Sequence, residues 1–509
     1  MPIYVDFVPI IQLKKAVLEL IESEYQSKKS FLKGAVEKYL EPHLNNLKED
    51  LHCVISSPYI DKVYRDSYYH YYSSKLTDYN RDCIRVSFFS CDLSKEMFRD
   101  RDKVEVVKEH FLGFIVIRPT EPQIIGRSTI NPKALKTNNF RCCTTKIACS
   151  VNAIKLEVEG FPHSSQDSET LSCAETTLWA LMEYFASKYP EYRPVLPSEI
   201  INVLKQMSSE RQLPSKGLSI RQMAYALKEF GFGTRLYSRD HYPNEFNRLI
   251  STYVESGIPI IIAVDNFHKG GAIGHAILTI GREEVIESKI SSLKKIDNTD
   301  SDYFNRIINE QNISFYDFGD IKNSFIFIDD NRVSYQSAYL DHPVLHYEDE
   351  RWHDCEINSF IVPLYPKIYL EAYEASTFCK DILVTFYCDK LKNKEIFFRF
   401  FLASSRSYKN YVALSPDFDN DSKDLILETS MSKFIWIAEL STKELVMKEK
   451  ATGLIILDAT EANTNNLKPL IFSSYQSETF IEDPKSHSIK NIELNLGVFS
   501  IYLNNLNAF

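Results

Sequence analysis

The order of helical and strand patterns within residues 172–340 constrains the fold of this chain more than any other feature. From 172 to 189 apolar residues recur at the spacing of one helical face, and three shorter helical patterns follow. Apolar strand patterns then occupy 258–264, 274–280 and 324–329. Helices that precede antiparallel-looking strands are typical of an α+β domain. We therefore predict such a domain over 161–340.

The chain is long enough for two further regions, because its 509 residues exceed the roughly 100–200 of a typical domain. Residues 1–160 combine helical patterns up to about residue 80, including one at 29–47, with later strand patterns. We interpret 123–141 as an extended loop. Residues 341–509 return to strand patterns around one helix at 365–378. The prediction is a helical plus β N-terminal region, the α+β domain and a β-rich C-terminal region.

The composition of the chain indicates its cellular compartment and the classes of partner that it does not bind. The net charge of −10 argues against a general binder of nucleic acid or anionic membranes, which needs clustered positive charge. No apolar stretch approaches the roughly 20 residues that span a bilayer, and the N-terminus lacks a signal-peptide pattern. The ten cysteines are scattered rather than dense as in a disulfide scaffold. We expect a reduced, cytoplasmic protein with no nucleic-acid or membrane partner.

The segment around Cys173 carries the clearest chemical signal. Cys173 stands at the start of the predicted 172–189 helix, and Gln166 precedes it by seven residues. A thiol at a helix N-terminus lies at the positive end of the helix dipole, which favours the nucleophilic thiolate. The side-chain amide of Gln166 and the backbone N–H of Cys173 can both donate to a developing oxyanion. This pattern is typical of acyl transfer through a cysteine.

A cysteine nucleophile needs a base, and the base needs a group that orients it. His275 opens an apolar strand behind several glycines, and Asp329 and Asp330 end the next strand. Adjacent strand residues point to opposite faces, so only one aspartate should meet the imidazole. We predict Asp330, on the face of Ile326 and Ile328. Asp329 is the alternative orienting residue. If Asp330 orients the imidazole, Asp329 should instead hold the end of the strand by accepting hydrogen bonds from backbone N–H groups.

Taken in order, Gln166, Cys173, His275 and the Asp329/Asp330 pair resemble the papain-like cysteine peptidase superfamily. The likeness is strongest to the peptidase family that cleaves double-glycine leaders from bacteriocins, and to its stand-alone bacterial relatives. It covers 161–340 only. The resemblance implies a papain-like fold and a Cys–His–Asp triad. It also implies an oxyanion hole that includes Gln166, with no metal and no cofactor.

Three departures from that family stand out. Gln166 lies one residue further from the cysteine than the family has it. The residues after the nucleophile are Ala174 and Glu175 where the family has a glycine. A long polar insertion, 282–323, replaces a short hairpin. We predict that this insertion is a surface element that gates or selects substrate, since long loops are usually functional or disordered.

Other constellations carry weaker signals. His268 is a competing base in the loop before His275. Two His/Cys sets could be read as metal ligands: the first has no standard zinc spacing, and the second is more metal-like by composition. They are Cys142, Cys143, Cys149 and His163, and His342, His346, His353 and Cys355. We interpret the second set as a solvated loop that joins two domains. No phosphate-binding or dinucleotide-binding glycine motif is present.

The expected activity is hydrolysis of a peptide or isopeptide bond through a Cys173 thioester, on a protein or peptide substrate. Another acyl transfer on the same fold, such as transglutamination or deamidation, is the alternative within enzymes. An inactive papain-like module that binds a protein partner is the alternative outside them. The large flanking regions also fit a latent peptidase that a regulatory partner releases, as in a bacterial defence role.

Overall fold

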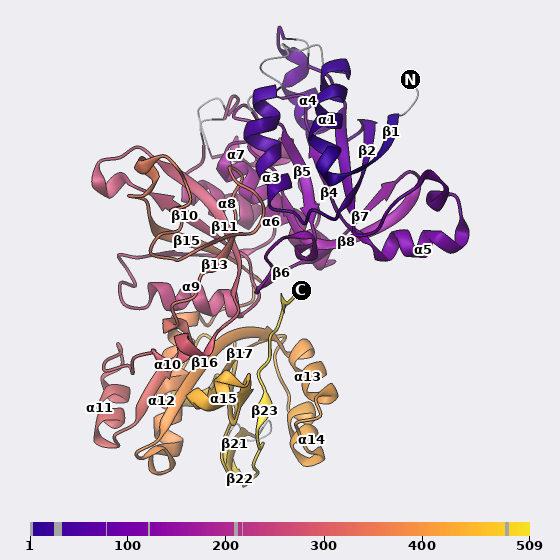
Figure 1. Cartoon of the computed structure of the whole chain (residues 1–509). Coiled ribbons are helices and arrows are strands. Elements are labelled where there is room, and N and C mark those ends of the chain that lie inside the picture. Colours follow the sequence, from indigo (N-terminus) through magenta and orange to yellow (C-terminus); the bar gives the residue numbers. More distant parts are fainter. Residues whose placement is uncertain are drawn as a thin grey trace.

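The computed structural model describes residues 4–24, 33–77, 79–120, 123–207, 212–215, 217–483 and 488–509. Within these residues the strands form three large sheets and one small two-stranded sheet, with helices packed beside them (Figure 1). The predicted mixture of helices and strands is confirmed. No helix in these ranges is both long enough and apolar enough to cross a membrane.

The first sheet is antiparallel and belongs to the N-terminal region. Its strand order is β1-β2-β3-β4-β5-β8-β7. The strands are β1 (Tyr4–Pro9), β2 (His52–Tyr59), β3 (Cys83–Phe89), β4 (Phe111–Ile117), β5 (Ile125–Ile130), β7 (Thr145–Val151) and β8 (Ile154–His163). The helices of this region are α1 (Ile10–Glu24), α3 (Glu41–Asn45), α4 (Lys62–His70) and α5 (Arg101–Glu109). Part of the helix predicted at 29–47 lies outside the described residues.

Two expectations for this region are wrong. Strand β2 interrupts the stretch that we expected to be helical up to residue 80, and β5 lies inside the expected loop 123–141. Strand β5 has polar residues at its centre, which made it resemble a loop. In the fold it is an inner strand, and Arg127 is neutralised by Glu183 of the neighbouring helix at 3.0 Å. Because this ion pair compensates the charge of Arg127, the strand can be buried without an apolar sequence pattern.

The central sheet has the strand order β14-β13-β11-β10-β15-β9, and β6 and β24 extend it from β11. The strands are β6 (Phe140–Cys143), β9 (Gly233–Ser238), β10 (Ile260–Asp265), β11 (Gly274–Glu283), β13 (Phe325–Ile328), β14 (Gln336–Ala338), β15 (Glu356–Leu364) and β24 (Leu506–Asn507). Four helices accompany it: α6 (Cys173–Lys188), α7 (Pro197–Leu204), α8 (Ile220–Glu229) and α9 (Phe246–Glu255). This sheet therefore draws strands from outside the expected range 161–340.

The third sheet has the order β12-β16-β17-β19-β20-β21-β22 and fills the lower part of Figure 1. Its strands are β12 (Ser314–Asp317), β16 (Glu395–Ser404), β17 (Phe434–Ser441), β19 (Gly453–Asp458), β20 (Leu470–Tyr475), β21 (Glu478–Glu482) and β22 (Ile489–Glu493). Strands β18 (Lys450–Ala451) and β23 (Phe499–Ser500) form the small sheet. The helices are α12 (Ala372–Leu391), α13 (Ser405–Leu414), α14 (Asn420–Glu428) and α15 (Lys443–Met447). Helix α12 begins and ends later than the predicted 365–378.

The insertion 282–323 is not a surface element, which corrects the sequence prediction. It contains α10 (Glu287–Ser291), α11 (Asp302–Glu310) and β12, and β12 pairs in parallel with β16 of the third sheet. Phe304, Ile308 and Phe315 of the insertion are buried in the same hydrophobic cluster as β16 and α12. The insertion thus completes the core of the third sheet. The sequence did carry a signal for this, because Phe304, Ile307 and Ile308 recur at helical spacing on α11 and Phe315 follows them on β12. The polar residues around them led us to interpret the segment as a loop.

A buried ionic network connects the central and third sheets. Glu255 of α9 pairs with Arg282 of β11 and, at 2.7 Å, with Arg399 of β16. Arg399 also pairs with Glu439 of β17 at 2.8 Å. Burial alone would raise the pKa of Glu255, but the two guanidinium groups outweigh it and hold that pKa at about 2. Glu255 therefore stays charged at neutral pH and joins the two sheets through its arginine partners, whereas burial raises the pKa of Glu439.

Candidate active site

Cys173 is the first residue of α6, and the loop before it is held by its own polar side chains. The Asp167 carboxylate accepts the backbone N–H groups of Glu169, Thr170 and Leu171 at 3.0, 2.7 and 2.8 Å. Glu175 accepts the backbone N–H of Ser172 at 3.1 Å, which completes the N-terminal cap. Most residues of α6 are buried, so the helix lies in the core with its half-buried thiol at the N-terminal end.

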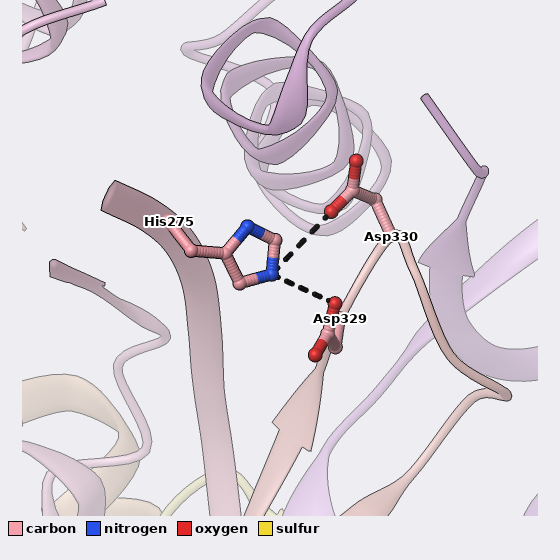
Figure 2. A group of neighbouring side chains, drawn as sticks. All are labelled: His275, Asp329 and Asp330. Carbon is pink, nitrogen blue, oxygen red and sulfur yellow. Dashed lines mark hydrogen bonds and ion pairs between the residues drawn. The ribbon is translucent and has the colours of Figure 1, made fainter. Parts of the chain in front are cut away.

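His275 is the second residue of β11, which packs on α6. The Thr177 hydroxyl donates to the backbone carbonyl of Ala276 at 3.0 Å and fixes the helix against this strand. The His275 side chain is only 2% exposed, and its Nε2 lies 2.9 Å from Asp329 Oδ1 (Figure 2). Burial opposes protonation of the imidazole. Asp329 and a hydrogen bond with Cys173 nevertheless raise the pKa of His275 well above its ordinary value.

Asp329, not Asp330, makes the hydrogen bond to His275, which corrects the preference drawn from strand alternation. Asp330 Oδ1 approaches Nε2 only to 3.7 Å (Figure 2). Strand β13 ends at Ile328, so both aspartates lie in the turn that follows it. Alternation of side chains does not extend into a turn. Asp329 also accepts the backbone N–H of Asn331 at 2.9 Å, so one carboxylate both holds the turn and meets the imidazole.

The Asp329 carboxylate is buried and fully engaged. The hydroxyl of Tyr347 donates to its Oδ2 at 2.7 Å, opposite the bond from His275 to Oδ1. Burial alone would raise the pKa of Asp329, but His275 outweighs it and the pKa falls below its usual range. Asp329 is therefore ionised, and the imidazole of His275 beside it is held in its protonated form. A carboxylate that orients an imidazole in this way is typical of a base that serves a neighbouring nucleophile.

The segment 347–353 covers the His275–Asp329 pair. The rings of Tyr347 and Trp352 stack with their centres 4.0 Å apart, and the rings of Trp352 and His275 meet edge to face with their centres 5.3 Å apart. His353 Nε2 donates to the backbone carbonyl of Tyr347 at 2.8 Å and closes the segment on itself. We name residues 347–353 the aromatic strap. The interpretation of this stretch as a solvated loop is therefore wrong, and the two site residues Tyr347 and Trp352 were not predicted from the sequence. Their one available signal was two aromatics in a charged segment.

Gln166 lies beside the same turn. Its side-chain amide donates to Asn331 Oδ1 at 2.6 Å, and Asn331 in turn donates its backbone N–H to Asp329. The turn is also held from behind, since His163 Nε2 lies 3.2 and 3.0 Å from the carbonyl oxygens of Asp329 and Arg332. The predicted residues Gln166, Cys173, His275 and Asp329 thus come together around one turn.

Asp330 has an unusual environment. Its side chain is 2% exposed, and neither carboxylate oxygen has a hydrogen-bond partner among the described residues. Burial and the nearby charge of Asp329 raise the pKa of Asp330 to about 7, although His275 opposes this rise. A carboxyl group in this state is largely protonated in mildly acidic solution, and it becomes a second buried negative charge as the pH rises.

The competing constellations are not assembled around the thiol. His268 lies 3.4 Å from Glu356 on a half-exposed loop. In the described part of the chain, neither His/Cys set from the sequence forms a cluster that could hold a metal ion. There, His275, Asp329 and Asp330 are the one group of three His, Cys, Asp or Glu side chains close enough to share a metal ion. Nε2 of His275 already binds Asp329, so we interpret this group as an orienting pair with a neighbouring acid.

Comparisons with known proteins add no assignment. No protein-family model matches the chain, and no curated protein matches it.

Proposed function

We propose that the chain is a cysteine hydrolase with a papain-like core, which cleaves a peptide or isopeptide bond. One observation carries the proposal: Asp329 Oδ1 lies 2.9 Å from His275 Nε2, and the Cys173 thiol is near enough to help raise the pKa of the same imidazole. Thiol, imidazole and carboxylate in this order make up a nucleophile, its base and an orienting group.

In the proposed mechanism Cys173 transfers its proton to His275, and the sulfur attacks the carbonyl carbon of the substrate. The carbonyl oxygen becomes an oxyanion, which accepts hydrogen bonds from the Cys173 backbone N–H and the Gln166 side chain. The C–N bond then breaks as His275 returns the proton to the leaving amine. Water, deprotonated by His275, hydrolyses the thioester and regenerates the thiol. Asp329 remains ionised throughout and orients the imidazole.

The first test measures the reactivity of the thiol. We expect low-dose iodoacetamide to alkylate Cys173 faster than Cys91, Cys149 and Cys388, which are also half-buried and serve as internal controls. Mass mapping identifies the modified residue. The His275→Ala variant should lose this advantage, because the thiolate loses its partner. Equal labelling of all four thiols would contradict the proposal.

The second test measures turnover. Protein mixtures digested with the native protein and with Cys173→Ala should differ by cleavages that only the native protein makes. Fast labelling without cleavage would instead direct the search to transglutamination or deamidation on the same triad.

Gln166 gives a further prediction once a substrate is found. Loss of one oxyanion donor costs about 10²–10³ in kcat. We expect this loss in Gln166→Ala, while alkylation of Cys173 stays fast. An unchanged kcat would show that another group stabilises the oxyanion.

A further inference from the structure

A polar cavity lies behind the Asp329–Asn331 turn, on the side of the N-terminal region. It encloses about 370 Å³, and its wall combines Lys38 and Tyr39 from the N-terminal helices with Gln123, Asn331 and Arg332. A volume above about 300 Å³ is in the range of sites for small molecules. Neither Cys173 nor His275 lines it, so the cavity is separate from the thiol.

The charge of the cavity wall is positive. Among the described residues that line it there are two cations, Lys38 and Arg332, and no aspartate or glutamate. Neither cation has a carboxylate partner within the described part of the chain. Each lies instead near an aromatic ring: Lys38 at 5.2 Å from the centre of Tyr39, and Arg332 at 4.0 Å from the centre of Tyr347. Among the residues that the structure describes, these two positive charges at the cavity therefore have no carboxylate partner.

A buried hydrogen-bonding group at the same wall also lacks a partner. Arg332 Nε is buried without a hydrogen bond to any described residue. His346, which lines the same wall, instead lies with its Nε2 3.9 Å from Asp329 Oδ2. Buried polar groups are satisfied in most proteins, and an unsatisfied donor costs about 1–3 kcal/mol. Donors beside an open cavity can be satisfied by a bound ligand.

We propose that this cavity binds a small molecule through a phosphate group. Donors come from three separate segments, which carry Lys38, Gln123 and Arg332. A phosphate presents acceptor oxygens in several directions, and a carboxylate presents only two in one plane. The uncompensated charge of the wall matches a dianion. The lining amides and Tyr39 suit the organic part of a phosphorylated metabolite.

The position of the cavity connects it to the thiol site. Asn331 is part of its wall, and it accepts the Gln166 amide at 2.6 Å while its backbone N–H holds Asp329 at 2.9 Å. A ligand that contacts Asn331 would favour one orientation of both residues. This effect on the thiol rests on the proposed function, whereas binding of the phosphate group does not.

The test measures binding calorimetrically with two probes, inorganic phosphate and a nucleoside monophosphate. Both should bind, and the nucleotide should bind more tightly because it also fills the organic part of the cavity. Lys38→Met and Arg332→Gln should each weaken binding about tenfold or more, since hydrogen bonds to charged groups are strong. Lys155→Met, which alters an exposed lysine on β8 outside the cavity, should bind as the native protein does.

Thermal melting without ligand shows whether each variant is folded. Binding retained in Cys173→Ala would show that this site functions independently of the proposed peptidase activity. Absence of binding by both probes would overturn the proposal. So would equal affinity in the native protein, Lys38→Met and Arg332→Gln. Tight binding of phosphate with no gain from the nucleotide would restrict the ligand to free phosphate.

Discussion

At the scale of single residues, the two adjacent aspartates have different surroundings and therefore different expected roles. Asp329 accepts hydrogen bonds from His275, Tyr347 and Asn331, whereas Asp330 has no hydrogen-bond partner among the described residues. We predict that Asp329→Asn lowers kcat by about 10²–10⁴, because the amide cannot hold the imidazole in its working form. Asp330→Asn should have a much smaller effect. Steady-state kinetics of both variants measures this difference, and the reverse order would restore Asp330 as the orienting residue.

Asp330 should also make stability depend on pH. Its pKa is raised to about 7 in the folded protein, against about 3.9 in an unfolded chain. A carboxyl group whose pKa is raised by folding stabilises the fold only at low pH. This stabilisation is lost as the pH rises through the pKa that the group has in the folded protein. Asp330→Asn removes this titration. The free energy of unfolding of the variant, relative to that of the native protein, should therefore rise between about pH 5 and about pH 8. One pKa unit is about 1.4 kcal/mol, so the change over this range is at most about 3 kcal/mol.

Denaturant unfolding at the two pH values measures this change. Asn331→Ala is not a suitable control, because Asn331 holds Gln166. Asp102→Asn is better, since Asp102 is exposed on α5 of the N-terminal region and takes no part in the site. A gain for Asp330→Asn that is equal at both pH values would contradict the argument.

At the scale of elements, the aromatic strap lies over the His275–Asp329 pair. Tyr347→Phe removes the hydroxyl that donates to Asp329 Oδ2 at 2.7 Å but keeps the ring that stacks on Trp352. A buried carboxylate then loses one donor, which costs about 1–3 kcal/mol. We predict a lower kcat and an altered pH profile, because the carboxylate that supports the imidazolium is less well stabilised.

The control for the strap is Tyr339→Phe, which removes an exposed hydroxyl beyond β14. An unchanged pH profile in Tyr347→Phe, with only a lower melting temperature, would mean that the strap is structural and does not support the triad.

At the scale of the whole molecule, the ionic network of Glu255, Arg282, Arg399 and Glu439 joins the central and third sheets. Arg399 is 2% exposed and contacts both carboxylates. Arg399→Met would leave two buried carboxylates short of a partner, and breaking a buried pair typically costs about 3–5 kcal/mol. We predict a loss of this size at neutral pH.

The loss should shrink in acid. The lowered pKa of Glu255, about 2, contributes stability that is present above its unfolded value and disappears as the pH falls toward 2. Arg193→Met, which removes an exposed pair with Glu199, should cost about 1 kcal/mol or less. Urea unfolding of both variants measures the difference, and equal costs would show that the network does not connect the sheets energetically.

The sequence by itself determined the features that depend on local pattern. Helix α6 begins at Cys173 because Ser172 and Glu175 cap it, and β11 places His275 behind glycines, so the residues and their order could be predicted. The choice between Asp329 and Asp330 was decided by tertiary structure, since both lie in a turn whose geometry depends on Asn331 and His163. Strand β12, the strap and the polar cavity likewise depend on segments distant in sequence. Their partners are chosen by packing, which periodicity within one segment does not encode.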